Sequence, residues 1–184
     1  MLNPNKKYKM FKRLLFIVLV SLSMISCSYS FTGSSLHKDI KTIQINEFID
    51  ISPLKNPMLA QQFSTDVQNR FLQRTTLKGT KENPDILVEG EIVDYNPSTP
   101  ATVSSNTIST PSGGMIQTSQ NKMTITVKVH YENKYEPEKN FDRTYTDEAV
   151  FSSDLDINAI ESSQIKVVTE RIINKIFNDI IADW

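Results

Sequence analysis

The stretch from residue 122 to residue 131 alternates strictly between polar and apolar side chains. Its apolar positions are Met123, Ile125, Val127, Val129 and Tyr131. Successive side chains of a β-strand point to opposite faces, so this pattern predicts a strand with one buried face. The other face meets water or a partner. A sheet built on this strand needs a second layer over one face, and this requirement constrains the fold more than any other feature of the chain.

Two amphipathic segments can supply that layer. Asn56 is a favoured helix-capping residue and Pro57 a favoured first residue of a helix. Together they predict a helix over residues 57–74. A second helix is predicted from Asn158, which forms a capping box with Glu161, to Trp184 at the chain end. The apolar stripes are Leu59, Phe63, Val67 and Phe71 on the first helix, and Ile165, Val168, Ile172, Ile176, Ile180 and Trp184 on the second. We interpret both as core that packs on the sheet, and for the first helix partner contact is the alternative.

Three further strands are expected, over residues 40–48, 86–95 and 141–151. The segment 86–95 has apolar residues at both odd and even positions, and therefore on both faces of the strand. This is typical of a strand inside a sheet. Simple alternation places Ile86 and Ile92 on one face and Tyr95 on the other. Gly90 marks a bulge or a close approach of another backbone.

The element order is therefore strand, helix, three strands, helix. This order predicts a single α+β domain over residues 39–184, a two-layer sandwich in which two helices pack on one face of a four-stranded mixed sheet. The connection through the first helix is expected to be right-handed if its flanking strands are parallel neighbours.

The N-terminus has the pattern of a secretory signal. Five cations lie between Lys6 and Arg13, a short apolar run follows, and the only cysteine of the chain is Cys27. The run is too short to span a bilayer. The residues Met24-Ile25-Ser26-Cys27 resemble a bacterial lipobox, which implies a signal peptide over residues 1–26, lipid attachment at Cys27 and a tether over residues 27–38. The alternatives are a plain signal peptide with an incidental cysteine, or an uncleaved anchor.

Composition limits the function of the mature chain. Removing residues 1–26 leaves 15 cations and 21 anions, a net charge of −6, and a domain this acidic is a poor candidate for nucleic-acid binding. Lipidation would use the sole cysteine, so the fold must be held by its core without disulfides.

Residues 96–121 form an uncharged stretch rich in Ser, Thr, Pro and Gly, which predicts a long flexible loop. It is either a hairpin tip with no role or a loop that becomes ordered against a partner protein.

The residue types needed for catalysis are scarce, and we expect neither an enzyme nor a cofactor or metal site. His37 and His130 are the only histidines, and no metal-binding or phosphate-binding motif is present. His130 is interpreted as solvated or partner-facing rather than as a metal ligand. Lys122 and Lys128 share its strand face and are the candidate contacts for an anion such as a lipid phosphate. Glu89, Glu91 and Asp94 are interpreted as solvated acids.

Taken together, these segments resemble the LptE family of lipopolysaccharide-assembly lipoproteins. The resemblance rests on the lipobox cysteine with Tyr29-Ser30-Phe31-Thr32-Gly33 after it, the strands at residues 41–45, 87–92 and 123–129, the Asn56-Pro57 helix start, and the final helix ending in Asp183-Trp184.

The resemblance implies a two-layer α/β domain anchored at the outer membrane, on its periplasmic face. It also implies a role as the plug of a partner β-barrel, LptD, which inserts lipopolysaccharide into the outer leaflet. A lipoprotein that binds or carries a small apolar ligand between sheet and helices is the alternative, and an enzyme is a third.

We expect the substitution Cys27→Ala to release the protein from membranes, because several acyl chains are needed for stable anchoring and all would depend on this thiol. Fractionation of membranes and soluble contents would measure the change. A variant that still sediments with membranes would contradict lipid attachment at Cys27.

Overall fold

The computed structural model describes residues 36–101, 108–109, 115–116 and 120–181. The elements are β1 (Thr42–Ile45), β2 (Ile49–Asp50), α2 (Pro57–Arg74), β3 (Lys78–Gly79), β4 (Ile86–Ala101), β5 (Ile108–Ser109), β6 (Met115–Ile116), β7 (Gln120–Asn133), the short 3-10 helix η1 (Pro137–Lys139), β8 (Phe141–Ser152) and α3 (Ile157–Ile181). Cys27 and Trp184 lie outside the described residues.

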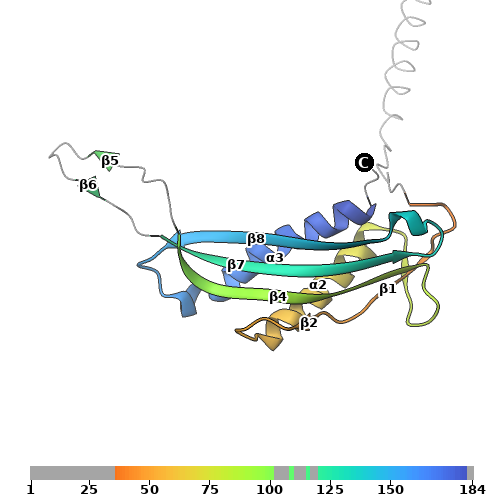
Figure 1. The fold of residues 1–184 in the computed structure, drawn as a ribbon, viewed down its shortest axis with the longest axis horizontal. Coiled ribbons are helices and arrows are strands. Elements are labelled where there is room, and N and C mark those ends of the chain that lie inside the picture. The colour runs from red at the N-terminus through yellow and green to blue at the C-terminus, as the bar shows by residue number, and fades with distance from the viewer. Residues whose placement is uncertain (1–35, 102–107, 110–114, 117–119, 182–184) are drawn as a thin grey trace, which may run out of the picture. The chain divides into compact units, whose positions relative to one another are not determined.

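The predicted two-layer α+β architecture is confirmed, and both helices lie on the same face of the sheet (Figure 1). The strand order is β3-β1-β4-β7-β8, with β2 also paired to β4. β1, β2 and β3 pair in parallel, whereas β4, β7 and β8 form an antiparallel meander. The sheet is therefore mixed, as expected, but it has six strands rather than four.

The two extra strands are short pieces of the predicted connections. β2 interrupts the segment after β1, and β3 lies between the predicted helix 57–74 and the predicted strand 86–95. Two-residue strands have no readable periodicity, so the sequence pattern did not reveal them.

The core lies between the sheet and the helices. All five alternating apolar residues of β7 are at most 2 % exposed, and the predicted apolar stripe of α2 is buried as well. On α3, Val168, Ile172, Ile176 and Ile180 are buried, and Ile165 packs against the core. The periodicities therefore identified the core correctly.

The start of α2 is the one predicted: the Asn56 side chain accepts a hydrogen bond from the Leu59 amide at 3.1 Å. The predicted cap of α3 is wrong. That helix begins at Ile157, and the Asp156 carboxylate accepts from the Asn158 amide at 3.0 Å. Glu161 is instead hydrogen-bonded to the hydroxyl of Tyr95.

Tyr95 corrects the predicted faces of β4. The register of β4 against β7 shifts between Ile92 and Asp94, which marks a bulge. An extra residue in one strand reverses the face of every side chain after it. Tyr95 therefore lies on the helical side with Ile92 and is 4 % exposed.

The long loop is shorter than expected, because β4 continues to Ala101 and β7 begins at Gln120. Pro97 lies in a second register shift, between Asn96 and Thr99. The pairing of β2 with β4 ends at Ile92, so beyond this residue β4 is an edge strand on that side among the described residues. Pro100 lies in this edge stretch. Edge positions and bulges tolerate proline, which explains how the strand runs through both.

Gly90 provides the close approach that its position predicted. A Cβ atom at this residue would lie 2.3 Å from the Lys128 carbonyl oxygen and 2.6 Å from Cε1 of Phe48. Phe48 is 1 % exposed and packs edge-on against Phe63 of α2. Glycine therefore lets the loop before β2 pack directly onto β4.

We predict that Gly90→Ala lowers the free energy of unfolding by about 1–3 kcal/mol, because overpacking displaces Phe48 or the β7 backbone. Urea-induced unfolding would measure the loss. Gly79→Ala is the matched control: its Cβ would meet only the Leu72 side chain, with Cδ2 at an ordinary 3.8 Å. Equal effects of the two substitutions would contradict the packing constraint at Gly90.

Candidate functional site

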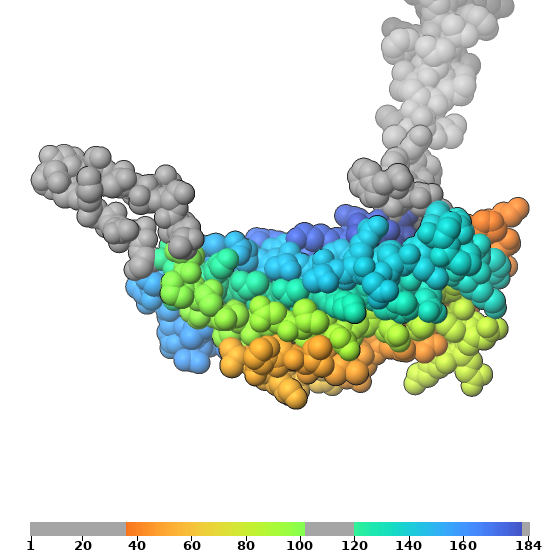
Figure 2. Space-filling model, in the orientation of Figure 1, coloured from red at the N-terminus to blue at the C-terminus, as the bar shows by residue number. Residues whose placement is uncertain are grey.

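The candidate anion-contact residues lie on the sheet face opposite the helices, which Figure 2 shows as adjoining bands of β8, β7 and β4. On this face Lys128 is paired with Glu91 of β4 and Thr144 of β8, and His130 with Glu89 and Asp142. Basic side chains of β7 are thus flanked by acidic side chains.

Lys122 is already paired. Its Nζ lies 2.7 Å from Oε2 of Glu148 on β8. The ion pair offsets the positive charge, so Lys122 is not a free cation for a lipid phosphate.

Lys128 lines a surface hollow of about 350 Å³, which also contains His130 and the acids Glu47, Glu89, Glu91 and Asp142. Four carboxylates around one lysine make the potential of this hollow negative, which disfavours a bound anion. The structure therefore does not bring Lys122 and Lys128 together into a cationic patch. Their contact with lipopolysaccharide stays a prediction.

His130 lies between two carboxylates. Its Nε2 is 3.1 Å from Oε1 of Glu132, and its Nδ1 is 3.1 Å from Oδ1 of Asp142. The hydrogen bond to Glu132 and that to Asp142 raise the pKa of His130 above its ordinary value of 6.5. In the part of the chain that the structure describes, no three His, Cys, Asp or Glu residues are grouped to hold a metal ion.

A second surface feature was missed by the sequence reasoning. Residues 49–58 expose four large apolar side chains, namely Ile49, Ile51, Leu54 and Met58. Asp50 turns inward, where its carboxylate accepts hydrogen bonds from the amides of Ser52 and Asn56. Because side chains alternate along a strand, Ile49 and Ile51 turn outward, and they are 62 % and 51 % exposed. We call these four residues the exposed apolar cluster.

The signal for this cluster was present in the sequence. The segment contains four large apolar residues that do not follow the repeat of a helix or a strand. Pro53 and Pro57 lie among them. We interpreted residues 49–55 only as a connection, and Met58 as part of the predicted helix. Large apolar side chains that stay exposed within one short segment are candidates for an interaction site.

The uncharged segment 96–121 contributes a third feature. Its ends belong to the β4–β7 ladder, and within it β5 and β6 pair as a separate two-stranded sheet. It is therefore a hairpin extension rather than an unstructured loop over its described residues.

The small-ligand alternative receives little support. Three hollows of about 600, 350 and 740 Å³ open on the described surface, and each has charged side chains in its lining. A site for an apolar ligand would be lined mainly by apolar groups. In the described part of the chain, no helix is long and apolar enough to cross a membrane.

Comparison with known families assigns the chain to a family. The sequence model of LptE, described as lipopolysaccharide-assembly, matches residues 40–181. The chain belongs to the LptE family. The match spans every strand and helix described above, from just before β1 to the end of α3, and it confirms the resemblance predicted from the sequence. Membership makes this an LptE-type lipopolysaccharide-assembly protein.

Other comparisons add little to the family assignment. No curated protein matches the chain. Solved structures with a similar arrangement include a minor lipoprotein from Acinetobacter baumannii (15 % identity, 76 % of this chain and 90 % of that chain, TM-score 0.43). The uncharacterized lipoprotein B from Nitrosomonas europaea is also similar (14 % identity, 78 % and 83 % coverage, TM-score 0.44), as is the rare lipoprotein B from Shewanella oneidensis (11 % identity, 74 % and 89 % coverage, TM-score 0.37). These values are too low to bear on function.

The raised pKa of His130 predicts a pH-dependent contribution to the stability of this LptE-family domain. Because the pKa of His130 is higher in the folded than in the unfolded protein, protonation of this side chain stabilises the fold. The contribution is complete below the unfolded-state pKa of about 6.5 and is lost as the pH rises through the folded-state pKa. Between about pH 6 and pH 8.5 the free energy of unfolding of the wild type should fall by up to about 1 kcal/mol more than that of the His130→Gln variant. This amount is typical of a partly exposed ion pair. Urea titrations at both pH values would measure the difference. Parallel pH profiles of the two proteins would contradict it.

Proposed function

We propose that the protein is an outer-membrane lipoprotein, anchored through Cys27 on the periplasmic face, that acts as the plug and assembly partner of an LptD-type β-barrel. The barrel would insert lipopolysaccharide into the outer leaflet. The observation that carries the proposal is the LptE family match over residues 40–181. The basic segment, short apolar run and Cys27 support the anchor.

The exposed apolar cluster supports a protein partner. Met58 is 76 % exposed at the start of α2, and Leu54 is 54 % exposed in the turn before it. Burying apolar surface releases about 25 cal/mol per Å², so covering this cluster would contribute to association. A partner that contacts β2 and the start of α2 would remove it from water.

The uncharged hairpin supports the same conclusion. A charged segment must lose its hydration when a protein covers it, whereas residues 96–121 carry no charge and avoid this cost. We therefore propose the uncharged segment 96–121 as a contact with the barrel wall.

Replacing residues 102–119 by Asn-Gly would test this contact. Ala101 and Gln120 are direct cross-strand partners, so a two-residue type I′ turn can close the β4–β7 hairpin without changing the domain. We expect unchanged thermal unfolding and an at least tenfold loss of barrel recovered in a gentle-detergent pull-down, because a lost contact of about 1.4 kcal/mol gives that factor.

A Gly/Ser segment of the same length in place of residues 102–119 is the control for chain length. If both variants recover the barrel as the wild type does, the hairpin is not the contact. If the lipidated wild type recovers no large outer-membrane β-barrel, the plug function itself is wrong.

A further inference from the structure

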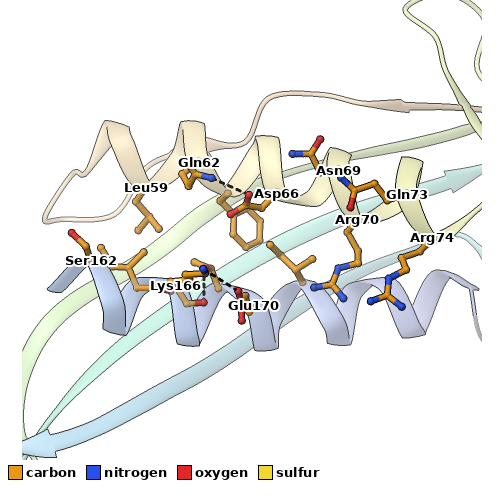
Figure 3. Close-up of a pocket in the computed structure, with 14 residues that line it drawn as sticks. Leu59, Gln62, Asp66, Asn69, Arg70, Gln73, Arg74, Ser162, Lys166 and Glu170 are labelled. Atoms are coloured by element: carbon orange, nitrogen blue, oxygen red, sulfur yellow. Dashed lines mark hydrogen bonds and ion pairs between the residues drawn. The ribbon is translucent and has the colours of Figure 1, made fainter. Parts of the chain in front are cut away.

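A groove of about 600 Å³ separates the facing sides of α2 and α3 (Figure 3). Its α2 side extends from Leu59 to Arg74, about 22 Å along a helix that rises 1.5 Å per residue. The two helices run in the same direction, and the buried side chains of Leu59, Phe63 and Ile173 are part of the lining. The groove is thus long, partly apolar and placed away from the sheet face described above.

Side chains of both charge signs line the Leu59 end of the groove. The carboxylate of Asp66 accepts a hydrogen bond from Gln62 at 2.9 Å. Lys166 and Glu170 form an ion pair on α3 at 3.9 Å. This end therefore presents both signs of charge.

The other end carries two arginines that form no ion pair with a described residue. Arg70 and Arg74 extend from α2 toward α3 in Figure 3, and neither has a hydrogen bond or ion pair with any residue that the structure describes. The two acids that line the groove have other partners: Asp66, one turn before Arg70, accepts from the Gln62 amide, and Glu170 is paired with Lys166. Asp179 of α3 is engaged with β8, where it accepts from Arg143 at 2.7 Å and from Tyr145 at 2.8 Å.

Helix electrostatics explain only part of this arrangement. A cation in the last turn of a helix interacts favourably with the helix dipole, which accounts for Arg74. It does not account for Arg70, whose half-buried side chain crosses the groove one turn earlier. Together the two arginines place a local positive charge in a mature chain whose net charge is −6.

We propose that this groove binds an acidic amphipathic segment of a partner protein, whose carboxylates pair with Arg70 and Arg74. Residues four apart on a helix are separated by about 6 Å along its axis. Two carboxylates one helical turn apart, or two residues apart in an extended segment, match that spacing. Arginine binds carboxylates through two parallel hydrogen bonds, so the pair would fix both position and register.

The remaining lining favours a polypeptide over an anionic lipid. Gln62, Asn69 and Gln73 carry amides that both donate and accept hydrogen bonds, as a peptide backbone requires and acyl chains do not. Asp66 and Glu170 would repel a uniformly anionic ligand but allow one whose negative charge lies at the arginine end. The proposal goes beyond the barrel contact, because it concerns the helical layer and specifies the charge of the bound segment.

Photo-crosslinking in cells would test the groove with the full-length lipidated protein. A benzoylphenylalanine replaces Gln73, which lines the groove. In the control it replaces Gln68, another exposed α2 residue, which lines a different hollow beside β1 and β3. We expect the Gln73 probe, but not the Gln68 probe, to label a protein segment that carries at least two carboxylates. Mass spectrometry of the cross-linked peptide identifies the segment.

Charge reversal completes the test. Arg70→Glu with Arg74→Glu should reduce the Gln73 cross-link at least tenfold, and Arg70→Gln with Arg74→Gln should reduce it in the same direction. Lys78→Glu with Lys81→Glu makes the same change in net charge elsewhere and should leave the cross-link unchanged. Changing the carboxylates of the labelled segment to arginine should restore the cross-link in the double charge-reversal variant. Thermal unfolding of each variant confirms that it is folded.

Several outcomes would overturn the proposal: labelling of lipid alone, labelling of a segment without acids, no excess of Gln73 over Gln68 labelling, or a cross-link insensitive to both arginine variants. Barrel recovery is measured in the same cells. The two proposals are separated if the hairpin variant loses the barrel but keeps the Gln73 cross-link. They are also separated if a variant keeps the barrel but loses the cross-link.

Discussion

Burial of a single apolar sheet face under two helices is the constraint on which the other features of this domain depend. Met123, Ile125, Val127 and Val129 of β7 have no exposed surface, because α2 and α3 cover the same face. Apolar burial of this kind supplies most of the stabilisation of a domain. It also leaves the opposite face free for polar side chains, which line β4, β7 and β8 there.

Polar contacts then orient α3 on that apolar layer. Asp147 of β8 pairs with Lys175 at 2.8 Å and with Arg171 at 3.3 Å. Burial opposes ionisation of Asp147, but the hydrogen bonds from Lys175 and Arg171, together with one from the Glu148 amide, outweigh it and lower the pKa. Exposed ion pairs contribute little free energy, so their main effect is to select one orientation of the helix.

Other contacts of α3 explain why the interhelical groove retains unpaired charge. The described acids of α3 are engaged with β4, with β8 or within α3 itself, through Glu161, Asp179 and Glu170. None of these carboxylates is left for the arginines of α2. The positive end of the groove is therefore a consequence of how the sheet holds α3, and the negative hollow around Lys128 lies on the other layer.

Local periodicity determined which residues form the core, where α2 begins and ends, and the α+β class, because strand and helix repeats are properties of neighbouring residues. Tertiary structure alone decided the short strands β2 and β3, the bulge that turns Tyr95 inward, and the extension of β4 past two prolines. It also decided that Lys122 and Lys128 meet acids from other strands, and that Arg70 and Arg74 meet none among the described residues. These outcomes depend on which segments pair and in which register, and residues far apart in the chain set that register only when the whole sheet and its helices have assembled.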